Sequence, residues 1–200
     1  MIGKIFITSS GYDPELGKHV KDPYLGDHPS LGACRPDIRR KVVRGDHIFV
    51  ISGRVANADQ FVMGGFEVET KIHASEAYVL FPEQRLHLRG DGQIGGNIIV
   101  NARGAQHRLD THSSFDERIR NYVVGKEAVA LVTPEEIARG RVETLGVLCD
   151  VLGKKGLSPK EVVGRWGTEL TESQVIEILA WLHLVKQAAA RGRSRGSHGR

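Results

Sequence analysis

The segment from residue 32 to residue 68 places the strongest constraint on how this chain folds. A cationic run at residues 35–44 passes through the Gly-Asp pair at 45–46 into an apolar, β-branched stretch. This order predicts a turn that leads into a buried strand, with positive charge beside it. The next apolar stretch holds a Gly-Gly pair at 64–65. Glycines inside a strand indicate a bulge or the close approach of another group, so we expect this strand to bend.

Six short apolar segments predict strands, and most of them are not separated by a helical pattern. Gly, Asp and Asn residues lie between them, as is typical of turns. This order favours an α+β fold built on a small antiparallel β-barrel. The predicted strands are residues 2–8, 48–52, 61–72, 77–81, 97–102 and 128–132.

Residues 9–30 contain three prolines and no periodic apolar face, which predicts a long loop. Loops longer than about fifteen residues in a compact domain are usually functional or mobile. Tyr12 and Tyr24 lie in this loop, and aromatic rings beside cationic residues suit stacking on a planar ligand. The alternative is that these tyrosines only attach the loop to the body of the domain.

A second polar segment, residues 101–114, offers Asn101, His112 and Ser113 as hydrogen-bonding groups for a ligand. His107 and His112 with Asp110 match no metal-ligand spacing that we recognise, so we expect no metal. A Ser–His–acid hydrolase can be written from Ser113, His112 and Asp110. Residues this close in sequence do not usually reach the required geometry, which disfavours a hydrolase.

Four capping boxes announce helices, because a Ser or Thr is followed three residues later by Glu or Gln. The predicted helices are a short one from Ser114 to Tyr122, Pro134–Leu152, residues 159–166 and residues 172–190. In the last helix Val175, Ile178, Leu179, Leu182 and Val185 form an apolar stripe. A stripe of this size must be buried on the barrel or on a second subunit, so a homodimer or a partner protein is possible through this helical region.

Composition limits the remaining possibilities. Cys34 and Cys149 are an isolated pair, which indicates two reduced thiols. We expect a cytoplasmic protein with no membrane association, since the chain lacks a long apolar stretch. The net charge of +4 comes from residues 188–200, a basic segment rich in Arg, Gly and Ser that we expect to be disordered. Neither GxxxxGK[ST] nor GxGxxG occurs, and no cofactor is predicted.

The long loop, the segment CRPDIRR, the Gly-Asp turn and the strand FVMGGFEV together resemble the second group of the nucleotide modification-associated domain families. Those families are linked to the PUA-like superfamily, which includes the EVE, YTH and ASCH domains. The resemblance covers about residues 1–132 and rests most on residues 31–51. The matching positions are Cys34, Arg35, Pro36, Ile38, Arg39, Arg40, Gly45 and Asp46.

This resemblance implies a small pseudobarrel with a cleft for a single, often modified base that is flipped out of a nucleic acid. The Trp-lined cage of YTH readers has no counterpart, because Trp166 and Trp181 both fall in the helical region. The predicted domains are a PUA-like barrel at 1–132, a helical extension at 133–187 and the tail at 188–200.

We therefore expect a nucleic-acid binding module that recognises a base, whether in DNA, in RNA or as a free nucleotide. The predicted ligand-binding residues are Tyr12, Tyr24, Arg35, Arg39, Arg40, Asn101, His112 and Ser113. For Arg39 and Arg40 the alternative is a solvated edge that protects the sheet.

Two other functions stay open. The first is an enzyme acting on a modified nucleoside or nucleotide, with Asp46, Asp110, His112 or Lys41 as base or nucleophile. The second is an adaptor whose helical extension docks a partner.

Overall fold

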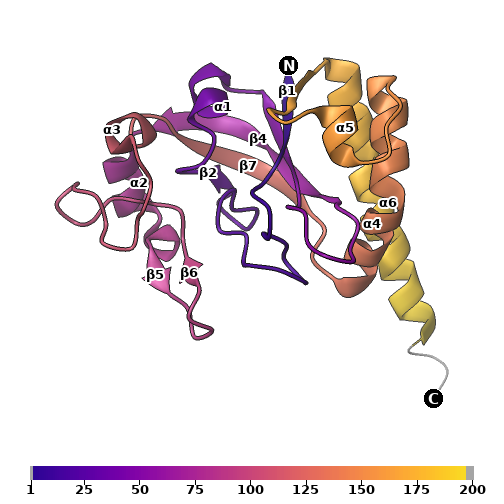
Figure 1. The fold of residues 1–200 in the computed structure, drawn as a ribbon, viewed down its shortest axis with the longest axis horizontal. Coiled ribbons are helices and arrows are strands. Elements are labelled where there is room, and N and C mark those ends of the chain that lie inside the picture. Colours follow the sequence, from indigo (N-terminus) through magenta and orange to yellow (C-terminus); the bar gives the residue numbers. More distant parts are fainter. Residues whose placement is uncertain (1, 197–200) are drawn as a thin grey trace. The chain divides into compact units, whose positions relative to one another are not determined.

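The computed structural model describes residues 2–196, and side chains as far as Arg191. The strands are β1 (Gly3–Ile7), β2 (Ser30–Leu31), β3 (His47–Ile51), β4 (Val62–Ile72), β5 (His87–Leu88), β6 (Ile94–Gly95), β7 (Tyr122–Ala130) and β8 (Thr168–Leu170). The helices are α1 (Pro36–Lys41), α2 (Ala74–Leu80), the 3-10 helix η1 (Pro82–Gln84), α3 (Phe115–Arg118), α4 (Pro134–Leu152), α5 (Pro159–Val163) and α6 (Glu172–Gly196). The predicted α+β class with helices at the C-terminal end is confirmed (Figure 1).

Six strands form one sheet in the order β2-β7-β4-β3-β1-β8, and β5 and β6 form a separate pair. β1 pairs with β8 in antiparallel fashion, as β2 does with β7. β1 and β3, however, are parallel, with Gly3 opposite His47. The expectation of an entirely antiparallel sheet was therefore wrong. The chain between β1 and β3 is long enough for the crossover that parallel strands require.

The chain folds into two compact units. Unit 1 consists of Met1–Tyr12, His47–Gly65 and Val129–Arg200, and unit 2 consists of Asp13–Asp46 and Phe66–Ala128. The helices α4, α5 and α6 therefore share a unit with β1, β3 and β8. β4 and β7 each begin in one unit and end in the other. These units cut across the predicted division at residue 132.

Several local predictions were wrong because short apolar segments fit more than one structure. The expected strand at residues 77–81 lies mostly in α2, where Ala74 and Ala77 are buried in a hydrophobic cluster. The expected strand at residues 97–102 makes only isolated bridges, at Ile98 and Val100. Ser114 does not cap α3 with its side chain, and the chain returns to a strand at Tyr122 instead of continuing as a helix.

The long helices follow the sequence pattern closely. Thr133 and Glu136 form the predicted capping box of α4. On α6, Val175, Ile178, Leu182 and Val185 are all fully buried, as the apolar stripe requires. Figure 1 shows α4 and α6 running alongside each other, and none of the helices described is long and apolar enough to cross a membrane.

The basic segment at residues 188–200 was expected to be disordered, but α6 continues to Gly196. The run Ala188-Ala189-Ala190 consists of the strongest helix former, so it extends a helix already held by its buried face. Residues 197–200 lie outside the described part of the chain.

Gly64 explains why the β4 segment carries paired glycines. Gly64 has φ +149°, and a Cβ atom there would collide with the Val129 carbonyl oxygen. A Cβ atom on Gly65 would collide with the Phe49 ring and the Ile48 carbonyl. The predicted close approach of another group is confirmed, and that group is neighbouring backbone and core side chain.

Glu136 gives unit 1 a predictable pH dependence. Its buried carboxylate accepts hydrogen bonds from the backbone N–H groups of Val132 (2.8 Å) and Thr133 (3.2 Å) and from Lys186 Nζ (3.3 Å). Burial alone raises its pKa, but these bonds outweigh burial and hold the pKa below the ordinary 4.5. The ionised form therefore stabilises the fold above pH 4.5, and this stability is lost as pH falls through the folded-state pKa.

We expect Glu136→Gln to be less stable than the natural chain at neutral pH, with the difference shrinking in acid. The test is to measure urea midpoints of both proteins by circular dichroism, from neutral pH to below pH 4.5. Profiles that stay parallel would show that the Glu136 carboxylate does not titrate as described.

Candidate functional site around His112

A polar loop in unit 2, residues 101–113, is fixed by its own hydrogen bonds. Asn101 Oδ1 accepts from the N–H groups of Arg103 (2.8 Å) and Ala105 (3.2 Å), which closes the first turn. The His107 N–H donates to the Ile99 carbonyl (2.8 Å), and Leu109 packs against a buried cluster. These contacts hold the part of the loop from Asn101 to Leu109 in place, directly before Asp110.

Asp110 and His112 form a hydrogen-bonded pair at the end of this loop. Asp110 Oδ1 lies 2.5 Å from His112 Nδ1, and Asp110 Oδ2 accepts from Gln106 Nε2 (2.7 Å). Gln106 also donates to the His112 carbonyl (3.0 Å). The Asp110 side chain is 0% exposed and that of His112 is 28% exposed. A buried carboxylate thus orients a partly exposed imidazole.

This arrangement determines which nitrogen of His112 can meet a ligand. An ionised carboxylate only accepts hydrogen bonds, so the Nδ1 that faces it carries the proton in a neutral ring. Nε2 is then the acceptor and the possible proton-accepting atom. A histidine that is held in this way is suited to hydrogen-bond a ligand or to act as a general base.

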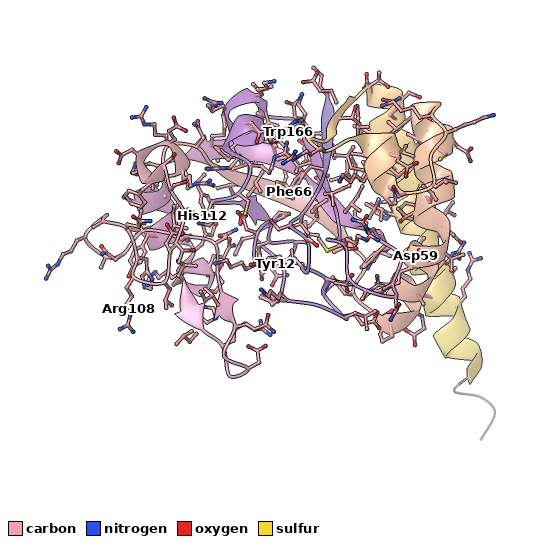
Figure 2. All side chains as sticks on the ribbon, in the orientation of Figure 1. Tyr12, Asp59, Phe66, Arg108, His112 and Trp166 are labelled. Atoms are coloured by element: carbon pink, nitrogen blue, oxygen red, sulfur yellow. The ribbon has the colours of Figure 1, made fainter. Side chains whose placement is uncertain are left out.

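The expectation that residues this close cannot reach each other was wrong for Asp110 and His112. The turn around Thr111 folds the two side chains onto each other, as the 2.5 Å contact shows. Within the described residues, no hydrogen bond joins the Ser113 hydroxyl to His112. The backbone carbonyl of Ser113 accepts from Arg118 Nε (2.9 Å). The structure therefore joins Asp110 to His112 and leaves the Ser113 hydroxyl outside this pair. Figure 2 labels His112 and the exposed Arg108 of the same loop.

Arg118, on α3, joins this loop to the turn before α1. Its Nε donates to Ser113 O and its NH1 donates to the Ala33 carbonyl (2.6 Å). Two non-glycine residues beside these contacts have left-handed backbone, Arg35 with φ 51° and Ser114 with φ 57°. Such conformations are unfavourable for residues with a side chain, and they cluster at functional sites. Arg35 and Ser114 thus hold an unfavourable backbone conformation beside the contacts of Arg118.

The buried carboxylate of Asp22 holds the turn at residues 32–34 in place. Asp22 accepts hydrogen bonds from the backbone N–H groups of Gly32 (2.8 Å), Ala33 (2.8 Å) and Cys34 (2.5 Å). Burial and the nearby Asp22 charge raise the pKa of the Cys34 thiol well above its usual range. Cys34 therefore stays protonated at neutral pH and is not a thiolate nucleophile.

A fully buried polar network is hydrogen-bonded to Asp22. Tyr122 Oη is within hydrogen-bond distance of Ser30 Oγ (3.0 Å), Gln84 Oε1 (2.6 Å) and Asn97 Oδ1 (2.8 Å). Burial is the main cause that raises the Tyr122 pKa, so the phenol stays neutral. Asn97 Nδ2 also donates to Asp22 Oδ1 (3.2 Å), which links the network to the turn. These buried groups therefore hydrogen-bond one another and the carboxylate that holds the turn.

The cationic run does not present all its arginines to solvent. Arg39 is 0% exposed, and its guanidinium donates to backbone carbonyls. Arg35 pairs with Asp37 through two hydrogen bonds, 2.9 Å and 2.7 Å, and that pairing lowers the Asp37 pKa. Arg40 is exposed. Of these residues, Arg40 is the one whose side chain is open to a ligand.

The other predicted residues fall in different places. Tyr24 is exposed beside the short strand β2, where its backbone pairs with Ser30. Tyr12 belongs to unit 1, and its carbonyl accepts from Gly53 N (2.7 Å). Asn101 uses its side-chain oxygen in the turn described above. The structure therefore connects Arg35, Arg39, His112 and Ser113 through Arg118 and the turn at residues 32–34.

The residues proposed for catalysis also differ in environment. Asp46 is buried and its carboxylate accepts from the Val43 N–H (2.9 Å), so it serves the Gly-Asp turn. Lys41 is exposed at the end of α1. Of the four candidates, Asp110 and His112 are the two that meet. Among residues 2–196, no group of three or more His, Cys, Asp or Glu side chains is placed to hold a metal ion.

The charged residues of unit 2 are balanced. The unit contains as many basic as acidic residues. Three of its acids, Asp13, Asp22 and Asp46, are buried, and the Asp110 carboxylate is covered. Arg39 is its one buried basic residue among those described. Six further bases are half-buried, however, so exposed acidic and basic residues are nearly equal in number in unit 2.

Sequence reasoning missed Gln106, Arg118 and Asp22, which orient the site. Gln106 and Asp110 are four residues apart, a spacing that is uninformative outside a helix. No family model, no curated protein and no solved structure matches this chain.

Proposed function

We propose that unit 2 is a nucleic-acid binding module that holds a single base, modified or unmodified, against His112. The observation that carries the proposal is the Asp110–His112 pair, in which a fully covered carboxylate fixes a partly exposed imidazole. A fixed His112 Nε2 can accept a hydrogen bond from an exocyclic amine or a ring N–H of a base.

Exposed basic residues support the same proposal. Arg40, Lys41, Arg108 and Arg120 of unit 2 are exposed, and their charges suit phosphate contacts. We further propose that the sheet belongs to a PUA-like fold, as the resemblance of the CRPDIRR segment implies. In this proposal the buried Arg39 holds the backbone around the site through its hydrogen bonds to carbonyls, and the exposed Arg40 contacts the nucleic acid.

The first test is the binding of labelled single-stranded DNA and RNA to the full chain, measured by fluorescence anisotropy at two salt concentrations. Binding should weaken as salt rises, because counterions are released from the phosphates. His112→Ala should weaken binding about tenfold, the effect of losing one charge-assisted or well-oriented hydrogen bond.

The control for this test is His183→Ala, which removes an exposed histidine of α6 in unit 1. It should bind like the natural chain. The proposal fails if neither oligonucleotide binds, or if His112→Ala binds as tightly as the control.

A second function is favoured by the same pair. An imidazole held by a buried carboxylate can accept a proton from a water or hydroxyl at Nε2, as a general base does. The chain would then act on a modified nucleoside or nucleotide. Incubation with nucleosides and nucleotides, followed by proton NMR, separates the two functions. Turnover that His112→Gln abolishes supports catalysis, and binding without turnover supports recognition alone.

A further inference from the structure

Unit 1 contains a cleft of about 920 Å³ that is separate from the His112 site. Its walls are the loop at residues 54–60, one face of α4 and the segment at residues 157–161, which leads into α5. Clefts of this size are typical of binding sites. Asp59, on the wall formed by the loop, is labelled in Figure 2.

Internal contacts hold the walls of the cleft in place. Arg141 NH1 donates to the Asp59 carbonyl (2.7 Å), and its guanidinium lies 4.7 Å from the Phe61 ring centre. The Gln60 amide donates to the Ser52 carbonyl (2.7 Å). Val55 and Ala58 form a β-bridge that closes the loop. A site already shaped in the free chain loses little conformational entropy when a ligand binds.

The most exposed large apolar side chains of the described residues both line this cleft. Leu157 is 90% exposed and Val142 is 81% exposed. Single exposed apolar residues are ordinary, but two that rim one concave surface indicate a site for an apolar group. The half-buried Leu145 lies on the same face of α4 and lines the cleft with them.

The charged groups that line the cleft carry a small excess of positive charge. Arg54, Arg141 and Lys160 line it, together with Asp59 and Glu161. The Glu161 carboxylate is used locally, since it accepts from the Leu157 N–H (3.0 Å) and from Ser158 Oγ (3.1 Å). These bonds leave the Glu161 charge in place, so three cations and two carboxylates line the cleft, an excess of one positive charge.

We propose that this cleft binds an acidic peptide segment of a partner protein, with one apolar side chain against Val142 and Leu157. Carboxylates on either side of that anchor would pair with Arg54 and Lys160. A nucleic acid strand is the less suitable occupant, because bases bind on aromatic platforms and none of the residues lining the cleft is aromatic. This proposal does not depend on the function of the His112 site.

The test uses three pools of short peptides against the full chain. In the first pool a central Leu is flanked by Asp and Glu, in the second the acids are replaced by Lys, and in the third the Leu is replaced by Ser. The first pool should bind at least tenfold more tightly than either of the others, and Leu157→Ser and Arg54→Glu should each remove about tenfold of that affinity.

Two matched variants control for surface chemistry alone. Leu184→Ser removes an exposed apolar residue of α6, and Lys155→Glu reverses an exposed charge, and neither residue lines the cleft. Both should bind the first pool like the natural chain. The proposal is overturned if no pool binds, if the pools bind equally, or if Leu157→Ser and Arg54→Glu match the controls. Displacement of the peptide by a single-stranded oligonucleotide would also overturn it, in favour of a nucleic-acid contact.

Discussion

Replacing Arg39 by alanine is expected to lower the free energy of unfolding by about 3–5 kcal/mol. The buried guanidinium donates to the carbonyls of Cys34 (3.0 Å), Arg118 (2.9 Å), Asn121 (2.7 Å) and Ala33 (3.3 Å). Alanine leaves these acceptors without their donor and opens a cavity the size of the side chain. Arg39→Lys should rescue only part of the loss, since one ammonium cannot reach all four oxygens.

The neighbouring Arg40 is the matched control for this prediction. Arg40 is exposed on the same helix, so Arg40→Ala should change stability by less than about 0.5 kcal/mol. Urea denaturation followed by far-ultraviolet circular dichroism is the measurement, because both tryptophans lie in unit 1 and their fluorescence reports that unit. Equal stabilities for the two variants would contradict the internal role given to Arg39.

Replacing Asp22 by alanine is the second change with a large expected effect, also about 3–5 kcal/mol. The carboxylate accepts from three consecutive backbone N–H groups and from Asn97 Nδ2, and alanine leaves the three backbone donors without this acceptor. Asp22→Asn keeps the shape of the side chain and one of its two acceptor oxygens. It should therefore lower the free energy of unfolding by less than Asp22→Ala does.

Asp27→Ala is the control, since Asp27 is exposed on the same loop. Amide hydrogen exchange of Gly32, Ala33 and Cys34 gives a local measurement beside the urea midpoint. These amides should exchange faster in Asp22→Ala and be unchanged in Asp27→Ala. Unchanged protection in Asp22→Ala would contradict the hydrogen bonds described for this turn.

The sequence predicted the parts of the fold that depend on local rules. Helix α4 was predicted with its bounds, because Thr133, Pro134 and Glu136 give a start signal and the apolar pattern continues to Leu152. The strand predicted at residues 77–81 failed because five apolar-rich residues suit a helix or a strand equally. Burial of Ala74 and Ala77 decided the outcome, and burial is a property of the whole unit.

The candidate site was predicted only in part, because its organisation depends on contacts between distant residues. The sequence identified His112 and Ser113 as polar groups on a loop. It could not show that Asp110 hydrogen-bonds to His112, because that contact depends on how the turn between them folds. Arg39 looked like a ligand-binding cation. Its acceptors include carbonyls 79 and 82 positions away in the chain, which no local pattern reveals.

The most direct test of the proposed function is to map bound nucleic acid on the full chain by amide NMR. A single-stranded oligonucleotide is titrated into the labelled protein, and the shift changes of each residue are followed. Our account predicts the largest changes at residues 106–113 and 33–35, and their loss in His112→Ala. Changes confined to unit 1, or equal changes in His112→Ala, would contradict it.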